Sequence, residues 1–150
     1  LGRADRKGAP DTFDGDGYRA LLERIRAAAS TGETVYAPGF YREIEEPIAA
    51  SLAVAPDTPL IITEGNYLLL DEAPWPRVAA QLDAIWYLDV DGAEREARLS
   101  ARHMRFGRSA SETRAWIAAT DHPNAERIAP TAARADRILR WNAERVAFAD

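Results

Sequence analysis

A carboxylate and a glycine end one of the most apolar stretches of the sequence. Residues 60–65 read LIITEG, and such a short, almost uncharged run predicts a strand buried on both faces of a parallel sheet. Ligands of open parallel sheets bind beyond the carboxyl ends of the strands, where Glu64 would lie. Gly65 would let the backbone pass close to a ligand. Glu64 is therefore a candidate catalytic carboxylate, and the alternative that it only ends a strand in solvent stays equally open.

A second candidate group is a row of arginines on one predicted helix. The four are Arg95, Arg98, Arg102 and Arg105, and residues 94–108 carry a local charge of +3. At 100° per residue, their spacing places them within an arc of about 80°. Several guanidinium groups on one helix can clamp a polyphosphate and stabilise the charge that spreads during phosphoryl transfer. A solvated helix face is the alternative, which loses ground because we expect no pairing with glutamate four residues away.

An aromatic segment with a proline follows a predicted short strand. Between Tyr36 and Arg42 it crowds Phe40 and Tyr41 into one loop, which could stack against a small substrate and orient it. A packed corner of the fold explains the same residues, and the segment alone favours that interpretation.

The two histidines do not predict a metal site. His103 and His122 are 19 residues apart, and neither has a third ligand at the spacing that metal sites use. We interpret His103 as surface of the helical lid and His122 as a residue at a helix start.

The elements that must position these residues alternate between helical and strand periodicity. A helix is predicted over 17–29, with Asp16 as N-cap, and another over about 92–106, capped by Asp91. Ser109 and Glu112 form a capping box for the helix after that. The other predicted elements are strands at 34–38 (stopped by proline), 50–54, 60–65, 83–90 and 136–141, helices at 75–82, about 109–120 and from 122 to Pro130, and a helical tail at 142–150. The strand–helix–strand order over 60–90 is a βαβ unit, so the fold class is α/β with a mostly parallel sheet and flanking helices.

Composition limits the class of protein. A chain of 150 residues with 47% hydrophobic and 29% charged side chains predicts a single domain over 1–150. The absence of cysteine excludes a disulfide scaffold, a thiol nucleophile and a cysteine-ligated zinc site. The longest apolar runs, such as 67–70, are far shorter than the roughly 20 residues of a membrane span. Because the net charge is −5, a nucleic-acid partner is disfavoured. We expect a cytoplasmic protein with no membrane partner.

Several motifs follow one another in a recognisable order. They are KGAPDTFD at 7–14, VYAP at 35–38 with Arg42 after it, TEGNYLLL at 63–70, LDV at 88–90, the arginine-rich helix, and DHPNA at 121–125. In this order they resemble the uridine kinase, phosphoribulokinase and pantothenate kinase family, and most closely its bacterial branch of fructose-transport-system kinases or nucleoside kinase-like proteins. The resemblance covers nearly the whole chain. It implies a P-loop NTPase-like fold of three α/β/α layers with an arginine-rich lid at about 92–122.

The same resemblance implies a function and the residues that perform it. The function is ATP-dependent phosphorylation of a hydroxyl group on a small metabolite, such as a nucleoside, a sugar or a pantothenate-like alcohol. Glu64 would act at the phosphates and touch magnesium indirectly, while Arg98, Arg102 and Arg105 would close over ATP. The acceptor side would contain Lys7, Asp14, Tyr36 and Arg42. The family often has an acidic residue directly before the last of these, where this chain has Tyr41, so the identity of the acceptor stays open.

One motif of the family is absent. A phosphate loop needs glycine-rich backbone followed by Lys and Ser or Thr, whereas the only lysine, Lys7, is followed by Gly8. We expect the loop and the general-base aspartate upstream of Leu1, in roughly 50–70 further residues, so that the fold is N-terminally truncated here. The alternative is a non-catalytic module that kept an anion-binding or partner-binding lid. Because a missing central strand exposes apolar edges, we expect this chain to be a homo-oligomer or poorly soluble.

Overall fold

A computed structural model of the chain describes residues 8–41, 43–44, 46–142 and 145–148. The chain divides into two compact units, and each is described by itself. The smaller unit is Asp14–Gly65, and the larger unit is Leu1–Phe13 with Asn66–Asp150. This division does not decide whether the two fold together, so the single domain over 1–150 stays a prediction.

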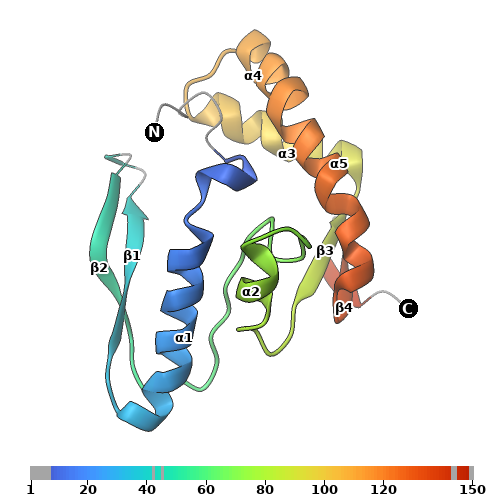
Figure 1. Cartoon of the computed structure of the whole chain (residues 1–150). Coiled ribbons are helices and arrows are strands. Elements are labelled where there is room, and N and C mark those ends of the chain that lie inside the picture. The colour runs from blue at the N-terminus through green and yellow to red at the C-terminus, as the bar shows by residue number, and fades with distance from the viewer. Residues whose placement is uncertain (1–7, 42, 45, 143–144, 149–150) are drawn as a thin grey trace. The chain divides into compact units, whose positions relative to one another are not determined.

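The smaller unit contains one helix beside a β-hairpin. Helix α1 (Gly15–Thr31) begins at Asp14, whose carboxylate accepts the N–H of Gly17 at 2.8 Å. The helix was predicted, but its N-cap is Asp14 rather than Asp16. It ends at Gly32, where a φ of 74° suits glycine and the N–H reaches the carbonyl of Ala28. Figure 1 shows α1 lying along the hairpin.

Strands β1 (Val35–Tyr41) and β2 (Glu46–Val54) form that hairpin and pair antiparallel. Both strands were predicted, but β1 continues through Pro38 instead of stopping there. The register shifts between Ala37 and Gly39, on either side of the residue that has no N–H to donate to the ladder. Across the irregularity, Ala50 adopts a φ of 55°.

The strand predicted over 60–65 does not form. In the part of the chain that the structure describes, these residues have no ladder partner. A strand buried on both faces needs a neighbour to satisfy its backbone groups, and without one Leu60 and Ile62 are 71% and 85% exposed. The predicted βαβ unit therefore lacks its first strand, while its helix appears as the short α2 (Trp75–Ala79) and its second strand as β3 (Trp86–Val90).

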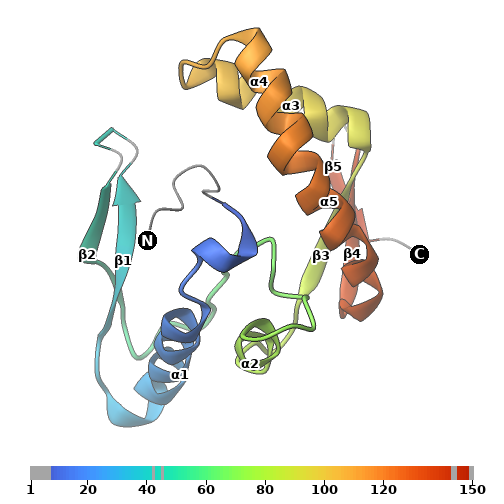
Figure 2. The same cartoon turned by 45° about the horizontal axis from the view of Figure 1, so that its top comes forward.

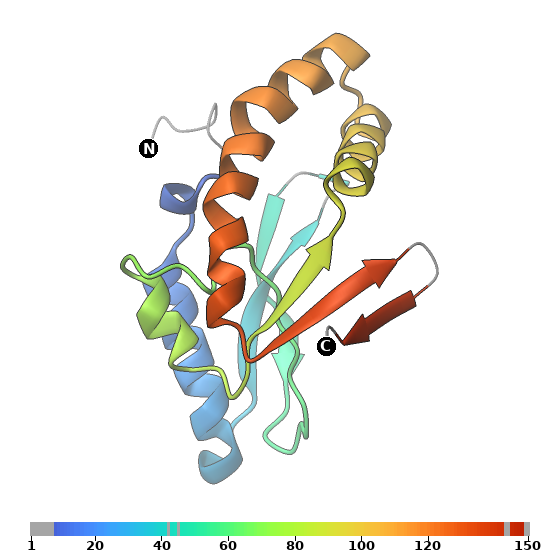
Figure 3. The same ribbon diagram turned by 90° about the vertical axis from the view of Figure 1, so that its right-hand side faces the viewer.

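A three-stranded sheet with the order β3-β4-β5 lies in the larger unit. Strand β4 (Arg137–Asn142) pairs parallel with β3, as the predicted α/β class requires, and β5 (Arg145–Phe148) pairs antiparallel with β4. Figure 3 shows these three strands side by side. The prediction of a helical tail over 142–150 was wrong. Tertiary packing overrides local preference here, because the ring of Phe148 meets that of Trp86 edge to face at 5.7 Å.

Helices make up the rest of the larger unit. Helix α3 (Gly92–Arg105) begins at Asp91, whose carboxylate accepts the N–H groups of Ala93 and Glu94 at 2.9 and 3.2 Å. The remaining helical segments are α4 (Ala110–Trp116), the π-helical turn η3 (Ile117–Asp121), α5 (His122–Ile128) and the 3₁₀ segment η4 (Ala129–Arg134), preceded near the N-terminus by the 3₁₀ turn η2 (Pro10–Thr12). Residues 110–134 run as one nearly continuous rod, with α3 beside its first half (Figures 2 and 3). Pro130 was predicted to end a helix, but it lies within the rod, in the first turn of η4.

The predicted capping box is present at the start of α4. The hydroxyl of Ser109 accepts the N–H of Glu112, and the carboxylate of Glu112 accepts the Ser109 N–H at 2.9 Å. The Ser109 hydroxyl also donates to the Glu112 carboxylate at 2.7 Å. This bond, followed by that of the Ser109 N–H, holds the pKa of Glu112 below its ordinary value.

Replacing Ser109 with alanine should therefore destabilise the start of α4. We expect a loss of about 1 kcal/mol in the free energy of unfolding at neutral pH. A carboxylate whose folded pKa is lowered stabilises the fold above its unfolded pKa, and that contribution disappears as the pH falls through the folded pKa. In S109A the pKa of Glu112 should rise toward its ordinary value, which a carboxyl NMR titration measures. An unchanged titration curve would contradict the box.

Each of the two units has a small hydrophobic core of its own. Leu22, Ala28 and Val35 are buried in the smaller unit. The larger unit buries a set that is mostly in and after the TEGNYLLL motif: Tyr67, Leu68, Leu70, Trp75, Val78 and Ile117. None of the helices among the described residues has the length and apolar character needed to cross a membrane.

Large apolar side chains remain exposed in both units. They include Leu60 and Ile62 in the smaller unit and Trp86 and Leu88 on one face of β3. Exposed apolar faces on strands favour association. We expect the 150-residue chain to run as a dimer or larger species in light scattering, with the I62D/L88D double variant at least ~2-fold less associated. Exposed Ala101 supplies the control A101D, and a sharp monomer peak for the unchanged chain would contradict this.

Candidate functional site

The arginine row lies on α3, as the sequence predicted, but its members differ in what they contact. Arg98 donates from Nε to a carboxylate oxygen of Glu94 at 2.7 Å. Its guanidinium also lies over the indole of Trp141 on β4, 4.5 Å from the ring centroid. The expectation that no glutamate pairs with the row was therefore wrong, because Glu94 stands four residues before Arg98 and the pair forms. Arg98 fastens α3 to the sheet.

Arg102 and Arg105 are available to a ligand, and Arg95, near the start of the same helix, is exposed as well. The first two are exposed on the last turns of α3, and neither makes an ion pair with a described residue of the chain. A cation there is also favoured by the negative end of the helix dipole, so the two charges are stable without a partner. Because the two side chains lie about one turn apart and are both positively charged, they suit the binding of a phosphate group.

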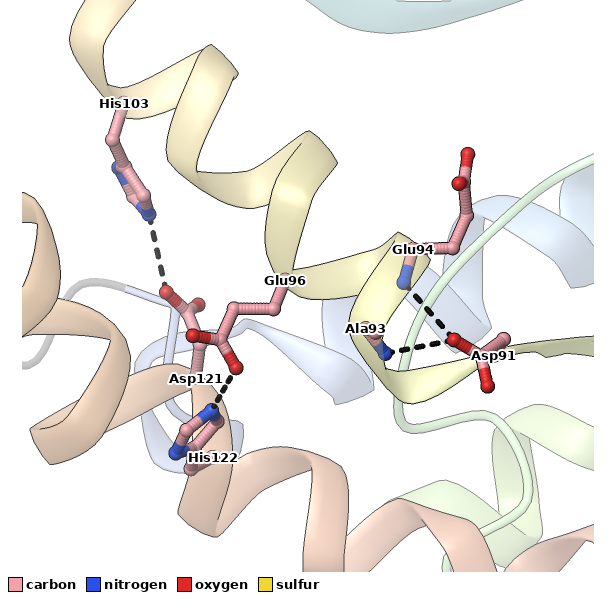
Figure 4. A network of polar contacts seen from close by, with 7 residues as sticks. All are labelled: Asp91, Ala93, Glu94, Glu96, His103, Asp121 and His122. Atoms are coloured by element: carbon pink, nitrogen blue, oxygen red, sulfur yellow. Dashed lines mark hydrogen bonds and ion pairs between the residues drawn. The ribbon is translucent and has the colours of Figure 1, made fainter.

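Two histidine–carboxylate contacts fasten α3 to the helical rod (Figure 4). His103 of α3 lies 3.1 Å from Asp121 at the end of η3, and His122 of α5 lies 3.1 Å from Glu96 of α3. The interpretation of His122 as a helix-start residue is confirmed. His103, however, is partly buried by its contact and is not simply surface. Glu96 and His103 are seven residues apart on α3, a two-turn spacing that already places them on one face.

The π-helical turn supplies the residue for one of these contacts. In η3 the chain carries one extra residue per turn over 117–121, and such turns inside α-helices often occur at functional sites. Ile117, at its start, is buried, and Asp121, at its end, faces His103. The region from α3 through α5 is thus tied together at several points.

Glu64 lies in the smaller unit, in a segment without regular structure. Its side chain is exposed, and the residue before it, Thr63, shares a short hydrogen bond with the hydroxyl of Tyr18 on α1. This contact anchors the segment immediately before the carboxylate. The carboxylate oxygens have no hydrogen bond to another described residue and are open to a ligand.

The residues predicted for the acceptor side have different surroundings. Tyr36 is an exposed residue of β1, and the Asp14 carboxylate already accepts the bond that caps α1. Lys7 and Arg42 lie outside the described residues. The preference for a packed corner at Phe40 and Tyr41 was wrong, because these residues end a strand and about half of each side chain is exposed.

An aromatic cluster in the larger unit was not anticipated from the sequence. Tyr67 and Trp75 are buried against each other at 5.5 Å between ring centroids, and Phe13 meets their edges at 5.6 and 6.3 Å. The hydroxyl of Tyr67 donates to the carbonyl of Gly8 at 2.5 Å. The cluster thus joins the KGAPDTFD motif to the TEGNYLLL motif. The sequence predicted the order of the two motifs but not the contact between them.

Comparison with known proteins gives the following relatives. No family model matches the chain. It is 39% identical over 128 residues to the ATP-dependent kinase-like protein notR' of Aspergillus versicolor, covering 82% of this chain and 73% of that protein. A solved structure from Silicibacter sp. TM1040, named as a candidate fructose transport system kinase, superposes with a TM-score of 0.78 at 35% identity, over 94% of this chain and 66% of that one.

A more distant structure supports the fold alone. YFH7 of Saccharomyces cerevisiae, described as a candidate P-loop containing kinase with a circular permutation, has a TM-score of 0.75 at 22% identity. The match covers 96% of this chain and 51% of YFH7, so the chain spans between half and three quarters of the length of these three proteins. The ordered motifs, the α/β fold and the similarity to notR' agree, and the chain belongs to the P-loop kinase family.

Proposed function

We propose that the full-length protein transfers the γ-phosphoryl group of ATP to a hydroxyl group of a small metabolite. The observation that carries this proposal is the pair of exposed guanidinium groups of Arg102 and Arg105, which have no ion-pair partner among the described residues, beside an Arg98 that is held by Glu94 and Trp141. Helix α3 is held in place by Arg98, and the guanidinium groups of Arg102 and Arg105 on it are both positive and exposed. In a kinase of this family, two such groups supply the charge needed to bind a polyphosphate.

The residues of the chain divide the work as follows. Arg102 and Arg105 bind the phosphate oxygens of ATP and stabilise their charge as the acceptor oxygen bonds to the γ-phosphorus and the bond to the β-phosphate oxygen breaks. The hydroxyl proton leaves to a base that we do not assign, and ADP departs with the other phosphates. Among the residues that the resemblance assigns to the acceptor, exposed Tyr36 of the smaller unit offers a ring face and a hydroxyl.

Magnesium fits the donor set at Glu64. Among the described residues there is no cluster of three or more candidate ligands, but magnesium with nucleotides uses one or two carboxylates together with phosphate oxygens and water. The exposed carboxylate of Glu64, which bonds to no described residue, supplies such a contact, directly or through water. When bound, magnesium neutralises charge on the phosphates.

A defined acceptor screen tests the proposal. Uridine, fructose and pantothenate represent the nucleoside, sugar and vitamin-like alcohols, and the full-length protein is incubated with each, ATP and magnesium. We expect an acceptor-dependent release of ADP and a new phosphate ester in ³¹P NMR with at least one class. Binding of ATP without transfer to any of them would favour the anion-binding module instead, and absence of ATP binding would refute the proposal.

A further inference from the structure

We propose that His103 is a positioning residue for ATP binding. Its contact with Asp121 sets the rotation of α3 about the helix axis, and with it the direction of the guanidinium groups of Arg102 and Arg105. This inference rests on the proposed function, in which these two arginines bind the phosphate oxygens. His103 itself does not touch the nucleotide. It acts through the last turns of α3, the helix that carries all three residues.

The contact joins two partly buried side chains on different elements. The Nε2 atom of His103 lies 3.1 Å from a carboxylate oxygen of Asp121 in η3, and the two side chains are 16% and 20% exposed. Since an ionised carboxylate only accepts, the Nε2–H group of His103 is the donor. Both groups are largely shielded from water, so water cannot easily replace a lost partner. This hydrogen bond therefore holds the end of α3 against η3.

The contact lies on a face of α3 that is turned away from the arginine row. At 100° per residue, His103 and Glu96 point in directions about 20° apart, roughly 130° from the centre of the arc that contains the arginines. Both residues of this face contact the helical rod, as Figure 4 shows. The rod therefore holds α3 by one face, while Arg102 and Arg105 project from another, where both are exposed.

The end of α3 has one defined shape next to this contact. The N–H of Gly107 donates to the carbonyl of Met104 at 3.1 Å, and the N–H of Arg108 donates to the carbonyl of His103 at 3.2 Å. With a φ of 95° at Gly107, these two bonds form the Schellman motif that closes many helices. The guanidinium of Arg108 then lies over the ring of Trp116 in α4, 3.8 Å from its centroid. A change in how His103 is held therefore turns the whole end of the helix.

The second histidine contact of α3 provides a matched comparison. His122 lies 3.1 Å from Glu96, the same distance, but these two side chains are 48% and 55% exposed. Water replaces a lost partner easily at such a site. Glu96 is also six residues before Arg102, whereas His103 directly follows it. Loss of the histidine should therefore weaken ATP binding at position 103 and hardly affect it at position 122.

Two amide variants of the full-length protein isolate the hydrogen bond. H103Q places an N–H donor near the position of Nε2, whereas the shorter H103N places it near Nδ1, from which it does not reach Asp121. In isothermal titration with ATP and magnesium, H103N should bind ATP about 5-fold more weakly, as loss of one partly buried hydrogen bond predicts. D121A, which leaves α3 unchanged, should bind as weakly as H103N. H103Q and the control H122A should stay within about 2-fold of the unchanged protein, as should kcat in every variant.

A double-mutant cycle separates positioning from a general loss of structure. In the R102A/R105A background the two cations are gone, so H103N should weaken ATP binding further by less than about 2-fold. The same loss with and without the two arginines would overturn the inference, as would unchanged ATP affinity in H103N and D121A, and in both cases the kinase function stands. Normal ATP binding by R102A/R105A itself would refute the role of these arginines in the proposed function, and the inference with it.

Discussion

Replacing Glu64 with glutamine is expected to lower kcat for phosphoryl transfer by about 100- to 1,000-fold. Glutamine keeps the size of the side chain but removes the negative charge that the proposed magnesium contact requires. Because Arg102 and Arg105 are unchanged, KM for ATP should move by less than about 3-fold. The rate of ADP release with a saturating acceptor measures kcat, and a titration over ATP concentration measures KM.

A matched exposed glutamate provides the control for this substitution. Glu33 lies in the smaller unit, between α1 and β1, and its side chain is also open to solvent. E33Q should leave kcat unchanged. If E64Q lost less than about 3-fold in kcat, Glu64 would be an ordinary surface carboxylate, which is the alternative that its sequence context left open.

The elements that the sequence predicted well are those specified by their own local chemistry. Helix α3 begins at Asp91 and α4 at Ser109 as expected, because a cap satisfies N–H groups that no other part of the chain can satisfy. The parallel pairing of β3 with β4 also agrees with the predicted sheet, whereas the antiparallel pairing of β1 with β2 was not predicted. Periodicity and capping act within a few residues and can be recognised without knowing the fold.

The elements that failed depend on partners that local pattern cannot identify. Residues 60–65 have the composition of a central strand, but a strand exists only as part of a ladder, and none forms with the described residues. The segment ending at Phe148 looked helical, yet its ring packs against Trp86 and it joins the sheet as β5. In both cases the neighbour across the sheet decides the structure.

The candidate site shows the same distinction at the level of side chains. Spacing placed the arginines on one face of α3 correctly, because a helix fixes that geometry. Spacing could not show that the guanidinium of Arg98 packs on the indole of Trp141, which is far along the chain. Nor could it show that the hydroxyl of Tyr67 donates to the carbonyl of Gly8. These contacts divide residues of the same type into those that hold the fold and those that remain open to a ligand.

That division predicts opposite consequences for two arginines on the same helix. In R102A, ATP should bind about 10- to 100-fold more weakly, because an exposed guanidinium is removed from the phosphates, and the free energy of unfolding should hardly change. In R98A, ATP affinity should fall by less than about 3-fold. The free energy of unfolding should fall by about 1 kcal/mol, since the contacts with Trp141 and Glu94 are lost at a partly exposed site.

Isothermal titration with ATP and magnesium, together with urea unfolding of each variant, separates the two effects. R105A should behave like R102A, because Arg105 is equally exposed and unpaired with any described residue. W141F, which keeps a ring but presents a smaller face to Arg98, should reproduce the loss of stability in R98A in part. The opposite result, weak ATP binding in R98A and normal binding in R102A, would mean that Arg98 leaves Trp141 to bind the phosphates. The contact with the indole would then be a resting position of the lid.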